Sequence, residues 1–576
     1  MKPGLENCEP AWRRLLLGPA GCGKSRLLRA AFAEAVRAGD AQRVLLLVPT
    51  ASYREHTRNE VLRESELRGL AGEPICTFSD LLRRLAPASG PVLTGARREL
   101  LLRRLLSELA LPEFRAVEEF PGFRAALAES VEELRRAGLT PDMLRAALPG
   151  RAHRPFLSFF EVYDKALERA GIDEGRQLCL ATGAIRSGAL RLRLLLVDGF
   201  SDFTPEQRAL LEALLPRGPG AEGPAAQIAL TLDRQTVDRQ SAGFFYQAER
   251  SRAWLQSLGF ADQWLEGNYR AAQAPALAAV ERLLRGEAGA AAEGPGPAEP
   301  AADSKPLVLI AAADRRDEVE LIARGVLRLG RSGMPWRDIG IIIHRPAIYA
   351  PLLREAFRAL GVPLRSFVPV PLLATAYGTH LRLCLDLFAA GSRPESIFRW
   401  LKSPHCTLAG LRESEIFEYR AIQRLSEARE GRWDKVVRPE SRLAEVLKRL
   451  AAFDREFEEP ARPAAMATRV TRLWEDMTRL HEIPEETSAS RALELRGEAA
   501  AMRRSSELLA EVAEAAEAET TGPMPFSEFR QLLLRRLAEE QIHVRDRRAD
   551  GVNLMSTFEA RQWELSAVFV PGLVEK

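Results

Sequence analysis

The sequence has few lysines, no paired cysteines and no long apolar run, and each shortage excludes a class of protein. Only eight of its 82 basic residues are lysine, and the formal net charge is +3, so no strong overall field exists to hold a polyanion. None of the six cysteines stands in a C-x-x-C pair, which argues against a zinc or iron–sulfur site and indicates a reducing compartment. Any contact with nucleic acid must therefore be local.

No stretch approaches about 18 uninterrupted apolar residues, and the first residues, MKPGLENCEPAWRR, lack the apolar core of a signal peptide. We therefore predict no membrane association and a cytoplasmic location. The length of 576 residues leaves room for several hydrophobic cores. A single small domain cannot account for a chain of this length.

What is present is an alternation of strands and helices, which is typical of a parallel α/β sheet. Strands are expected at 13–17, 43–50 and 192–200, around helical stripes such as Leu101, Leu105 and Leu109. After a stretch of Ala, Gly, Pro and Glu, strands are expected again at 307–313, 339–345, 552–557 and 567–573. The predicted segments are a first α/β part at 1–90, a helical insertion at 91–188, a second α/β part at 189–285, a linker at 286–305, a second α/β unit at 306–391, a second helical insertion at 392–545 and a closing strand segment at 546–576.

The strongest motif is GPAGCGKS, which fits G-x-x-x-x-G-K-[ST] between a predicted strand and a predicted helix. Its glycines let backbone N–H groups surround phosphates, the lysine reaches the β and γ phosphates, and the serine binds Mg²⁺. The motif therefore predicts ATP and Mg²⁺ as cofactors. The nucleotide-binding residues are Gly18, Gly21, Cys22, Gly23, Lys24 and Ser25, of which Cys22 is expected only to fill space.

A second Mg²⁺ ligand is expected at the end of another buried strand, and Asp198 in LLLVDGFSD stands there. An acidic residue beside such a ligand would orient the attacking water, but Gly199 occupies that position. We therefore expect slow or absent hydrolysis, and restoration of turnover by Gly199→Glu. An alternative is that Asp202 replaces the missing carboxylate.

The order of motifs resembles the UvrD-like superfamily 1 helicases. The P-loop is followed by VLLLVPTASYREHTRNEV, by Thr77-Phe78-Ser79, by the helical insertion and by VDGFSD, which resemble motifs Ia, Ib and II. The segments LTLDRQ, Asn268-Tyr269-Arg270 and GVNLMSTFEARQWELSAVFVPGL resemble motifs III, IV and V. The resemblance implies an α/β fold of two RecA-like P-loop domains, each with a mostly helical insertion.

The departures from that pattern, VDGFSDFTPEQ and the segment EAR in motif V, are similar to the AddB or RexB branch, which supplies one of the two chains of AddAB helicase-nucleases. That branch carries a PD-(D/E)xK nuclease domain with an iron–sulfur cluster, for which this sequence has no match. The triplet Asp303-Ser304-Lys305 lies in the predicted linker and is interpreted as chance. We expect no iron–sulfur cluster and no nuclease activity in this chain, and a truncation at Lys576, where the chain stops after a predicted buried strand.

The resemblance also implies roles for single residues. Gln235 and Arg270 match catalytic positions of active relatives, and Tyr269 and Arg270 match nucleotide contacts. The matches for DNA contact are Thr50, Thr77 and Phe78. Arg345 is a further candidate because it lies beside His344, which stands where the family's strand ends in Arg, and the alternative is an ordinary strand-end residue.

Three hypotheses follow from these observations. The first is an ATP-binding subunit that holds single-stranded or duplex-end DNA beside an AddA-like helicase/nuclease partner in double-strand break repair and recombination, with a weak ATPase of its own. The second is an active superfamily 1 helicase. The third, a P-loop kinase or nucleotide switch unrelated to DNA, leaves the second α/β unit and the Asn268-Tyr269-Arg270 motif unexplained.

Overall fold

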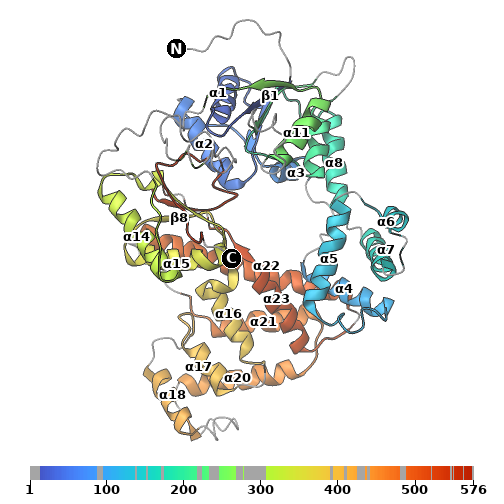
Figure 1. Cartoon of the computed structure of the whole chain (residues 1–576). Helices are drawn as coiled ribbons and strands as arrows, with labels where there is room; N and C mark the ends of the chain where they lie inside the picture. Colours follow the sequence, from blue (N-terminus) through green and yellow to red (C-terminus); the bar gives the residue numbers. More distant parts are fainter. Residues whose placement is uncertain are drawn as a thin grey trace.

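The structure is a computed structural model in which most of the chain can be described. The described residues are 13–65, 67–86, 95–136, 139–148, 150, 153–169, 174–216, 223–232, 245–267, 277, 280, 307–389, 393–407, 412–424, 435–437, 442–480, 488–520, 522–544, 546, 548, 550–561 and 563–573. They form an α/β protein with two parallel sheets and many helices (Figure 1). None of the described helices combines the length and apolarity needed to cross a bilayer.

The first sheet has six parallel strands in the order β3-β2-β4-β5-β1-β6. Its strands are β1 (Arg13–Gly18), β2 (Val44–Leu47), β3 (Ile75–Cys76), β4 (Leu194–Val197), β5 (Ala225–Thr231) and β6 (Ala261–Trp264). All carboxyl ends therefore meet at one edge of the sheet, and β5 lies between the P-loop strand β1 and the Asp198 strand β4.

Helices cover both faces of this sheet because alternate side chains of each strand point to opposite sides. Leu15 and Leu17 of β1 pack in one core and Leu16 in the other. The helices of the first core are α3 (Phe78–Leu85), α8 (Glu174–Arg186), α9 (Pro205–Leu214) and α11 (Tyr246–Ser257). The second core contains α1 (Lys24–Arg37) and α2 (Ala51–Ser65). Although α8 lies within the predicted helical insertion, it packs on the sheet.

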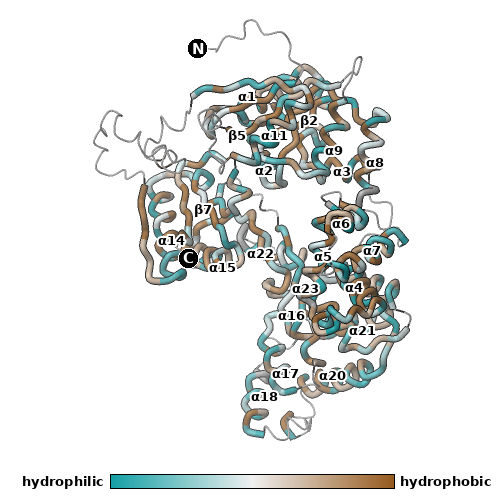
Figure 2. Tube along the Cα trace, turned by 45° about the vertical axis from the view of Figure 1, so that its right-hand side comes forward, coloured by the Kyte–Doolittle hydropathy of each residue, from teal (hydrophilic) through white to brown (hydrophobic). Residues whose placement is uncertain are grey.

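The second sheet has four parallel strands in the order β12-β7-β11-β8. The strands are β7 (Ile339–Ile343), β8 (Leu364–Ser366), β11 (Val552–Ser556) and β12 (Ala567–Phe569), and the helices α14 (Arg315–Arg331) and α15 (Pro346–Ala359) share their core. Figure 2 shows the strands around the labels β2, β5 and β7 in the brown of apolar residues. The two halves of the chain thus contain one parallel sheet each.

The strand predicted at 307–313 is wrong. No strand is assigned to these residues, and the apolar residues 307–310 are exposed, with Leu309 at 91%. A short apolar run predicts burial, but a strand also needs a neighbouring ladder, which a sequence pattern cannot reveal.

A first helical block follows α3 in the chain and consists of α4 (Gly95–Leu109), α5 (Pro121–Arg136), α6 (Pro141–Ala147) and α7 (Arg154–Arg169). Leu101 and Leu105 lie in its core and Leu109 packs against that core, which confirms the predicted apolar stripe. The residues of this stripe are therefore core residues.

A second helical block lies at the bottom of Figure 1, between the second sheet and α4. It contains α16 (Ala376–Asp386), α17 (Pro394–Leu401), α18 (Arg412–Gln423), α20 (Arg442–Glu458), α21 (Pro463–Met477), α22 (Ala489–Glu519) and α23 (Phe526–Glu539), with the short strand pair β9 (Val370–Pro371) and β10 (Gln541–Ile542) beside it. The apolar core of this block includes Ala96 and Leu100 of α4. The two helical blocks are therefore packed together.

The contact of α4 with α22 and α23, called here the α4 seam, also carries charge. Arg97 of α4 pairs with Glu519 of α22 at 3.3 Å, and Arg103 pairs with Glu528 of α23. Glu519 is almost fully buried, so its charge must be matched by partners across the seam.

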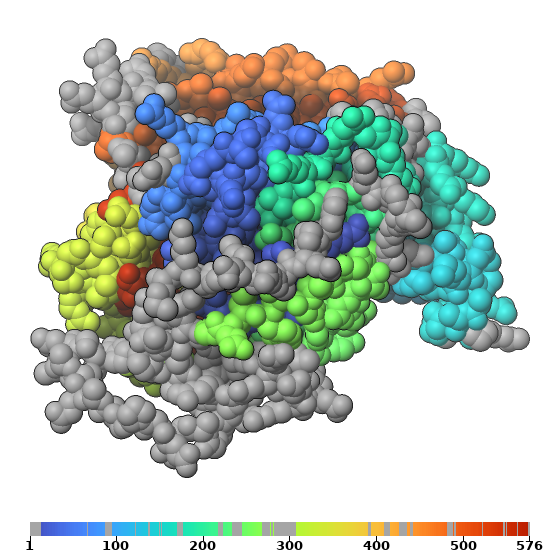
Figure 3. Space-filling view, turned by 90° about the horizontal axis from the view of Figure 1, so that it is seen from above, coloured from blue at the N-terminus to red at the C-terminus, as the bar shows by residue number. Residues whose placement is uncertain are grey.

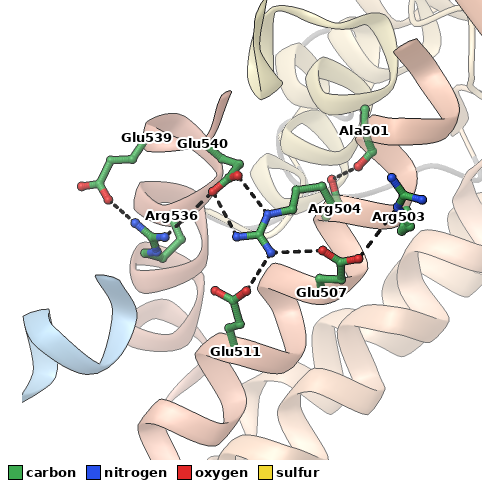
Figure 4. Close-up of polar contacts among 9 residues, drawn as sticks. Ala501, Arg503, Arg504, Glu507, Glu511, Arg536, Glu539 and Glu540 are labelled. Carbon is green, nitrogen blue, oxygen red and sulfur yellow. Dashed lines mark hydrogen bonds and ion pairs between the residues drawn. The ribbon is translucent and has the colours of Figure 1, made fainter. Parts of the chain in front are cut away.

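Within the second block, Arg504 holds α22 to α23 (Figure 4). Its guanidinium contacts Glu507 at 3.1 Å and Glu511 at 2.7 Å on its own helix, and Glu540 at 2.9 Å directly after α23. One cation thus satisfies three carboxylates from two parts of the chain.

We predict that Arg504→Gln lowers the free energy of unfolding by about 1 kcal/mol, because the three carboxylates lose a shared partner that is 29% exposed. The matched control is Arg503→Gln on the next position, where the side chain is 78% exposed and reaches Glu507 only at 3.9 Å. Chemical denaturation of both variants measures the difference. Equal stabilities would show that the cluster in Figure 4 contributes nothing.

Candidate functional site

The P-loop connects β1 to α1 at the carboxyl edge of the first sheet. Gly21 and Gly23 have φ values of 83° and 91°, which other L residues rarely adopt. Gly23 is the residue before α1, so the loop's backbone N–H groups and the positive end of the helix converge on one place. This geometry suits the binding of an anion.

Lys24 is folded over the same loop and is buried, with 6% of its surface exposed. Its ammonium donates to the carbonyl oxygens of Gly18 at 2.8 Å and Pro19 at 2.7 Å, and lies 3.4 Å from the Cys22 sulfur. Cys22 is itself buried beneath the loop, as its expected role of filling space requires. The ammonium is therefore held at the loop by neutral carbonyl groups.

Asp198 follows β4 and is 1% exposed. Ser25 of α1 donates to its Oδ1 at 3.0 Å, so the two predicted Mg²⁺ ligands meet although 173 residues separate them. Burial raises the pKa of Asp198 above its ordinary value, while hydrogen bonds from Tyr53 and Ser25 oppose that rise. A bound cation would favour the charged form, and hydroxyl and carboxylate oxygens are ligands that Mg²⁺ accepts.

The described residues contain no group of three or more His, Cys, Asp and Glu side chains that could hold a metal ion by themselves. A cation at Ser25 and Asp198 would therefore need phosphate oxygens or water to complete its coordination, as Mg²⁺ does in nucleotide sites. Ser25 and Asp198 therefore fit a Mg²⁺ ion whose other ligands are phosphate oxygens or water.

Tyr53 is a site residue that the sequence analysis missed. It lies in the first turn of α2 and donates from its hydroxyl to Asp198 Oδ2 at 2.7 Å. Burial first, and then the Asp198 charge, raises the pKa of Tyr53 well above its ordinary value, so the phenol stays protonated. Tyr53 could have been found from the pairing of β2 with β4, because this pairing places the residues that follow β2 beside the end of β4.

Gly199 has a φ of 87°, and a Cβ atom there would lie 3.0 Å from Pro49 Cδ and 3.3 Å from Tyr53 Cε1. Any other side chain would combine an unfavourable backbone conformation with a crowded position. Pro49 and the Tyr53 ring together border the position beside Asp198. The alternative carboxylate, Asp202, is exposed and accepts a hydrogen bond from Ser201 at 3.3 Å.

Three of the residues predicted to contact DNA make hydrogen bonds or packing contacts within the first α/β unit. Thr50 accepts a hydrogen bond from the Tyr53 backbone N–H, and Thr77 caps α3 in a reciprocal pair with Asp80. Phe78 is buried, with its ring 5.4 Å from that of Phe200.

Arg345 is exposed after β7 of the second sheet, at the start of α15. Thr50 and Thr77 follow adjacent strands of the first sheet, so they share an edge, whereas Arg345 belongs to the other sheet. Their contact with DNA stays a prediction. Gln235, Tyr269 and Arg270 lie outside the described residues, so their predicted roles also stay predictions.

We predict that Gly199→Glu does not restore ATP hydrolysis, contrary to the expectation from the sequence, because a side chain at this positive φ would be strained and would crowd Pro49 and Tyr53. The variant should be destabilised by about 1–3 kcal/mol. Gly39→Glu is the control, since Gly39 has the same φ of 87° but nothing within 4 Å of a Cβ. Thermal unfolding and ATP turnover are measured for both; a faster Gly199→Glu enzyme of unchanged stability would contradict the prediction.

Comparison with known proteins shows which sequences this chain resembles. Residues 15–281 match the family model described as ADDB, N-terminal. The chain is 28% identical over 420 residues to the B subunit of the ATP-dependent helicase/deoxyribonuclease of Desulforudis audaxviator, covering 68% of this chain and 35% of that protein. The proteins of the same name from Moorella thermoacetica and Bacillus subtilis are 26% and 23% identical, again over 35% of their length. The chain thus spans about a third of these relatives.

Proposed function

We propose that this chain, a confirmed relative of the AddB proteins, works as the ATP-binding, helicase-like part of an AddAB-type helicase/nuclease. It would hold single-stranded or duplex-end DNA and act beside an AddA-like partner in double-strand break repair and recombination. The relatives' name describes one subunit of an assembly, which is what suggests a partner. The observation that carries the proposal is the P-loop with Ser25 and Asp198 joined at 3.0 Å, within the part that matches the AddB family.

We further infer that the two α/β units are RecA-like domains. Support comes from the parallel order of both sheets and from the strand β5 that separates the P-loop strand from the Asp198 strand. The domain boundaries predicted from the sequence are part of this proposal.

In the proposed site, the glycines of the loop and Lys24 hold the phosphates of ATP, and Ser25 and Asp198 hold Mg²⁺. The ion would neutralise phosphate charge and fix the phosphate geometry. Lys24 exchanges neutral carbonyl partners for charged phosphate oxygens, which form stronger hydrogen bonds. Tyr269 and Arg270 would add further nucleotide contacts.

The motor of this chain is proposed to be weak, because no group in the described part stands beside Asp198 to orient water. Tyr53 cannot take a proton, since its own proton is held by Asp198 and its pKa is raised. Loss of general-base assistance typically costs about 10²–10⁴ in rate. The alternative of an active helicase requires turnover despite this loss.

We predict that Lys24→Ala weakens the binding of ATP with Mg²⁺ by at least about tenfold, because charge-assisted hydrogen bonds contribute roughly 1.5–3 kcal/mol each. Lys165→Ala, which removes an exposed ammonium from α7, is the control and should bind like the parent. Calorimetry measures both affinities. DNA-stimulated turnover that is robust in the parent and absent in Lys24→Ala would replace this proposal with the active-helicase alternative.

We predict that the chain binds single-stranded DNA without degrading it, and that affinity falls with added salt because phosphate contacts release counterions. Arg345→Ala should reduce affinity and flatten the salt dependence. Arg337→Ala is the control at the opposite end of β7, where the side chain is also exposed. Fluorescence anisotropy with a labelled oligonucleotide gives both values. Equal losses for the two variants would show that Arg345 has no specific role.

A further inference from the structure

Helix α2 lies between the nucleotide site and the second sheet. Thr50 ends the connection from β2 and accepts from the Tyr53 N–H, so Tyr53 lies in the first turn. Seen from above, the blue N-terminal part, to which α2 belongs, lies between the yellow surface of the second unit and the green-blue surface of residues near 180 (Figure 3). Side chains of α2 make contacts both toward Asp198 and toward the second sheet.

On the nucleotide side, α2 is attached at both of its ends. Tyr53 donates to Asp198 near the start of the helix. Near its end, Glu64 accepts two hydrogen bonds from the buried Arg29 of α1, at 2.9 and 3.0 Å. Because α1 begins at the P-loop, α2 is coupled both to the phosphate-binding helix and to the proposed Mg²⁺ ligand.

On the other side, the next residues of α2 contact the second unit. Glu55 accepts from Arg365 of β8 at 3.4 Å. The His56 ring stacks on Trp563 with a centroid distance of 4.2 Å and an interplanar angle of 19°. Trp563 also contacts Phe367, and Arg365 lies 4.9 Å above that ring. Two neighbouring α2 residues thus join a cluster of two aromatic rings and a guanidinium.

His56 and Trp563 are both half-buried at this contact. Burial first, and then the charges of Arg29, Arg365 and Arg63, lowers the pKa of His56 to about 4. The imidazole is therefore neutral near pH 7 and stacks as an aromatic ring. The contact depends on packing more than on ion pairing.

We propose that Tyr53 is a positioning residue for Asp198, and that α2 transmits the occupancy of the nucleotide site to the second sheet through Glu55 and His56. The proposal rests on the proposed function, because it requires nucleotide to bind at the P-loop. Tyr53, Glu55 and His56 lie within about one helical turn, which spans about 5.4 Å. A shift of Tyr53 that follows a change at Asp198 must therefore move the two contact residues as well.

The geometry also explains why a tyrosine and a glycine occur together here. The Tyr53 ring occupies the space beside Gly199, and its hydroxyl supplies the hydrogen bond to Asp198. The pair leaves Asp198 oriented toward Ser25 with its second oxygen satisfied. A phenylalanine would keep the ring packing and remove only the hydrogen bond.

The first experiment compares Tyr53→Phe with Tyr349→Phe, which removes a similar 2.8 Å hydrogen bond to a carboxylate, Glu318, in the second unit. With Mg²⁺ present, Tyr53→Phe should bind ADP about tenfold more weakly than the parent, because it loses a hydrogen bond to a charged group. In EDTA, Tyr53→Phe and the parent should bind ADP equally. Tyr349→Phe should match the parent both with Mg²⁺ and with EDTA. An equal loss with and without Mg²⁺, or no loss at all, would overturn the role of Tyr53.

The second experiment follows hydrogen exchange in residues 364–368 and 552–556 with and without saturating nucleotide. In the parent, nucleotide should change exchange in these segments at least about threefold. Tyr53→Phe, saturated to the same extent, should lose most of that response, and Tyr349→Phe should keep it.

Reciprocity gives an independent check of the coupling. If α2 links the sites, Arg365→Gln should alter nucleotide affinity although it lies on the second sheet, since coupling free energies act equally in both directions. Arg358→Gln, on the exposed side of α15, is the control and should leave affinity unchanged.

The outcomes separate the two proposals. Absence of any nucleotide binding by the parent would contradict the proposed function itself. Binding without a response in residues 364–368, or with the same response in Tyr53→Phe, would leave the proposed function standing and overturn the transmission through α2.

Discussion

A buried carboxylate at the end of a parallel strand sets the architecture of the candidate site. Asp198 is 1% exposed, and a charge at such a position is tolerated only if hydrogen bonds compensate for lost water. Ser25 and Tyr53 supply them from α1 and α2, so both helices are fixed relative to β4. Gly199 suits the same place, because its φ is 87° and a Cβ there would crowd Pro49 first and the Tyr53 ring second. The P-loop, the cation site and the contact with the second sheet all depend on this arrangement.

The parts of the site that could be predicted are those encoded locally. The P-loop residues occur within eight positions, and Asp198 ends a run of apolar residues that is typical of a buried strand. Tyr53 could not be found in this way, because its role depends on β2 lying next to β4. Phe78 shows another limit of local information. Its motif predicts a DNA contact, which stays a prediction, and the structure adds that the ring is buried against Phe200, a partner that no pattern near Phe78 reveals.

The fold shows the same division between local and distant information. Apolar spacing predicted a stripe of the first helical block that includes Leu101, and it predicted the strands β1, β2, β4, β7, β11 and β12. It did not predict β3, β5, β6 or β8. It could not show that Leu100 on a neighbouring face of α4 enters a core whose other members, apart from Ala96, lie between Leu372 and Ile542. It also assigned a strand to 307–313, where the apolar residues are exposed, because strand formation depends on an available partner edge. Partner choice is a property of the assembled chain.

The α4 seam gives the molecule a cyclic connectivity. The first sheet contacts the second through Glu55 and Arg365, and the second helical block contacts the first through Arg97 and Glu519. The backbone also joins these parts, and Arg358 of α15 pairs with Glu494 of α22 at 3.2 Å. Each of these contacts therefore forms within one chain, at a high effective concentration. If the contact at Glu55 and Arg365 or the one at Arg97 and Glu519 were broken, the parts on its two sides could separate, and the backbone would still connect them.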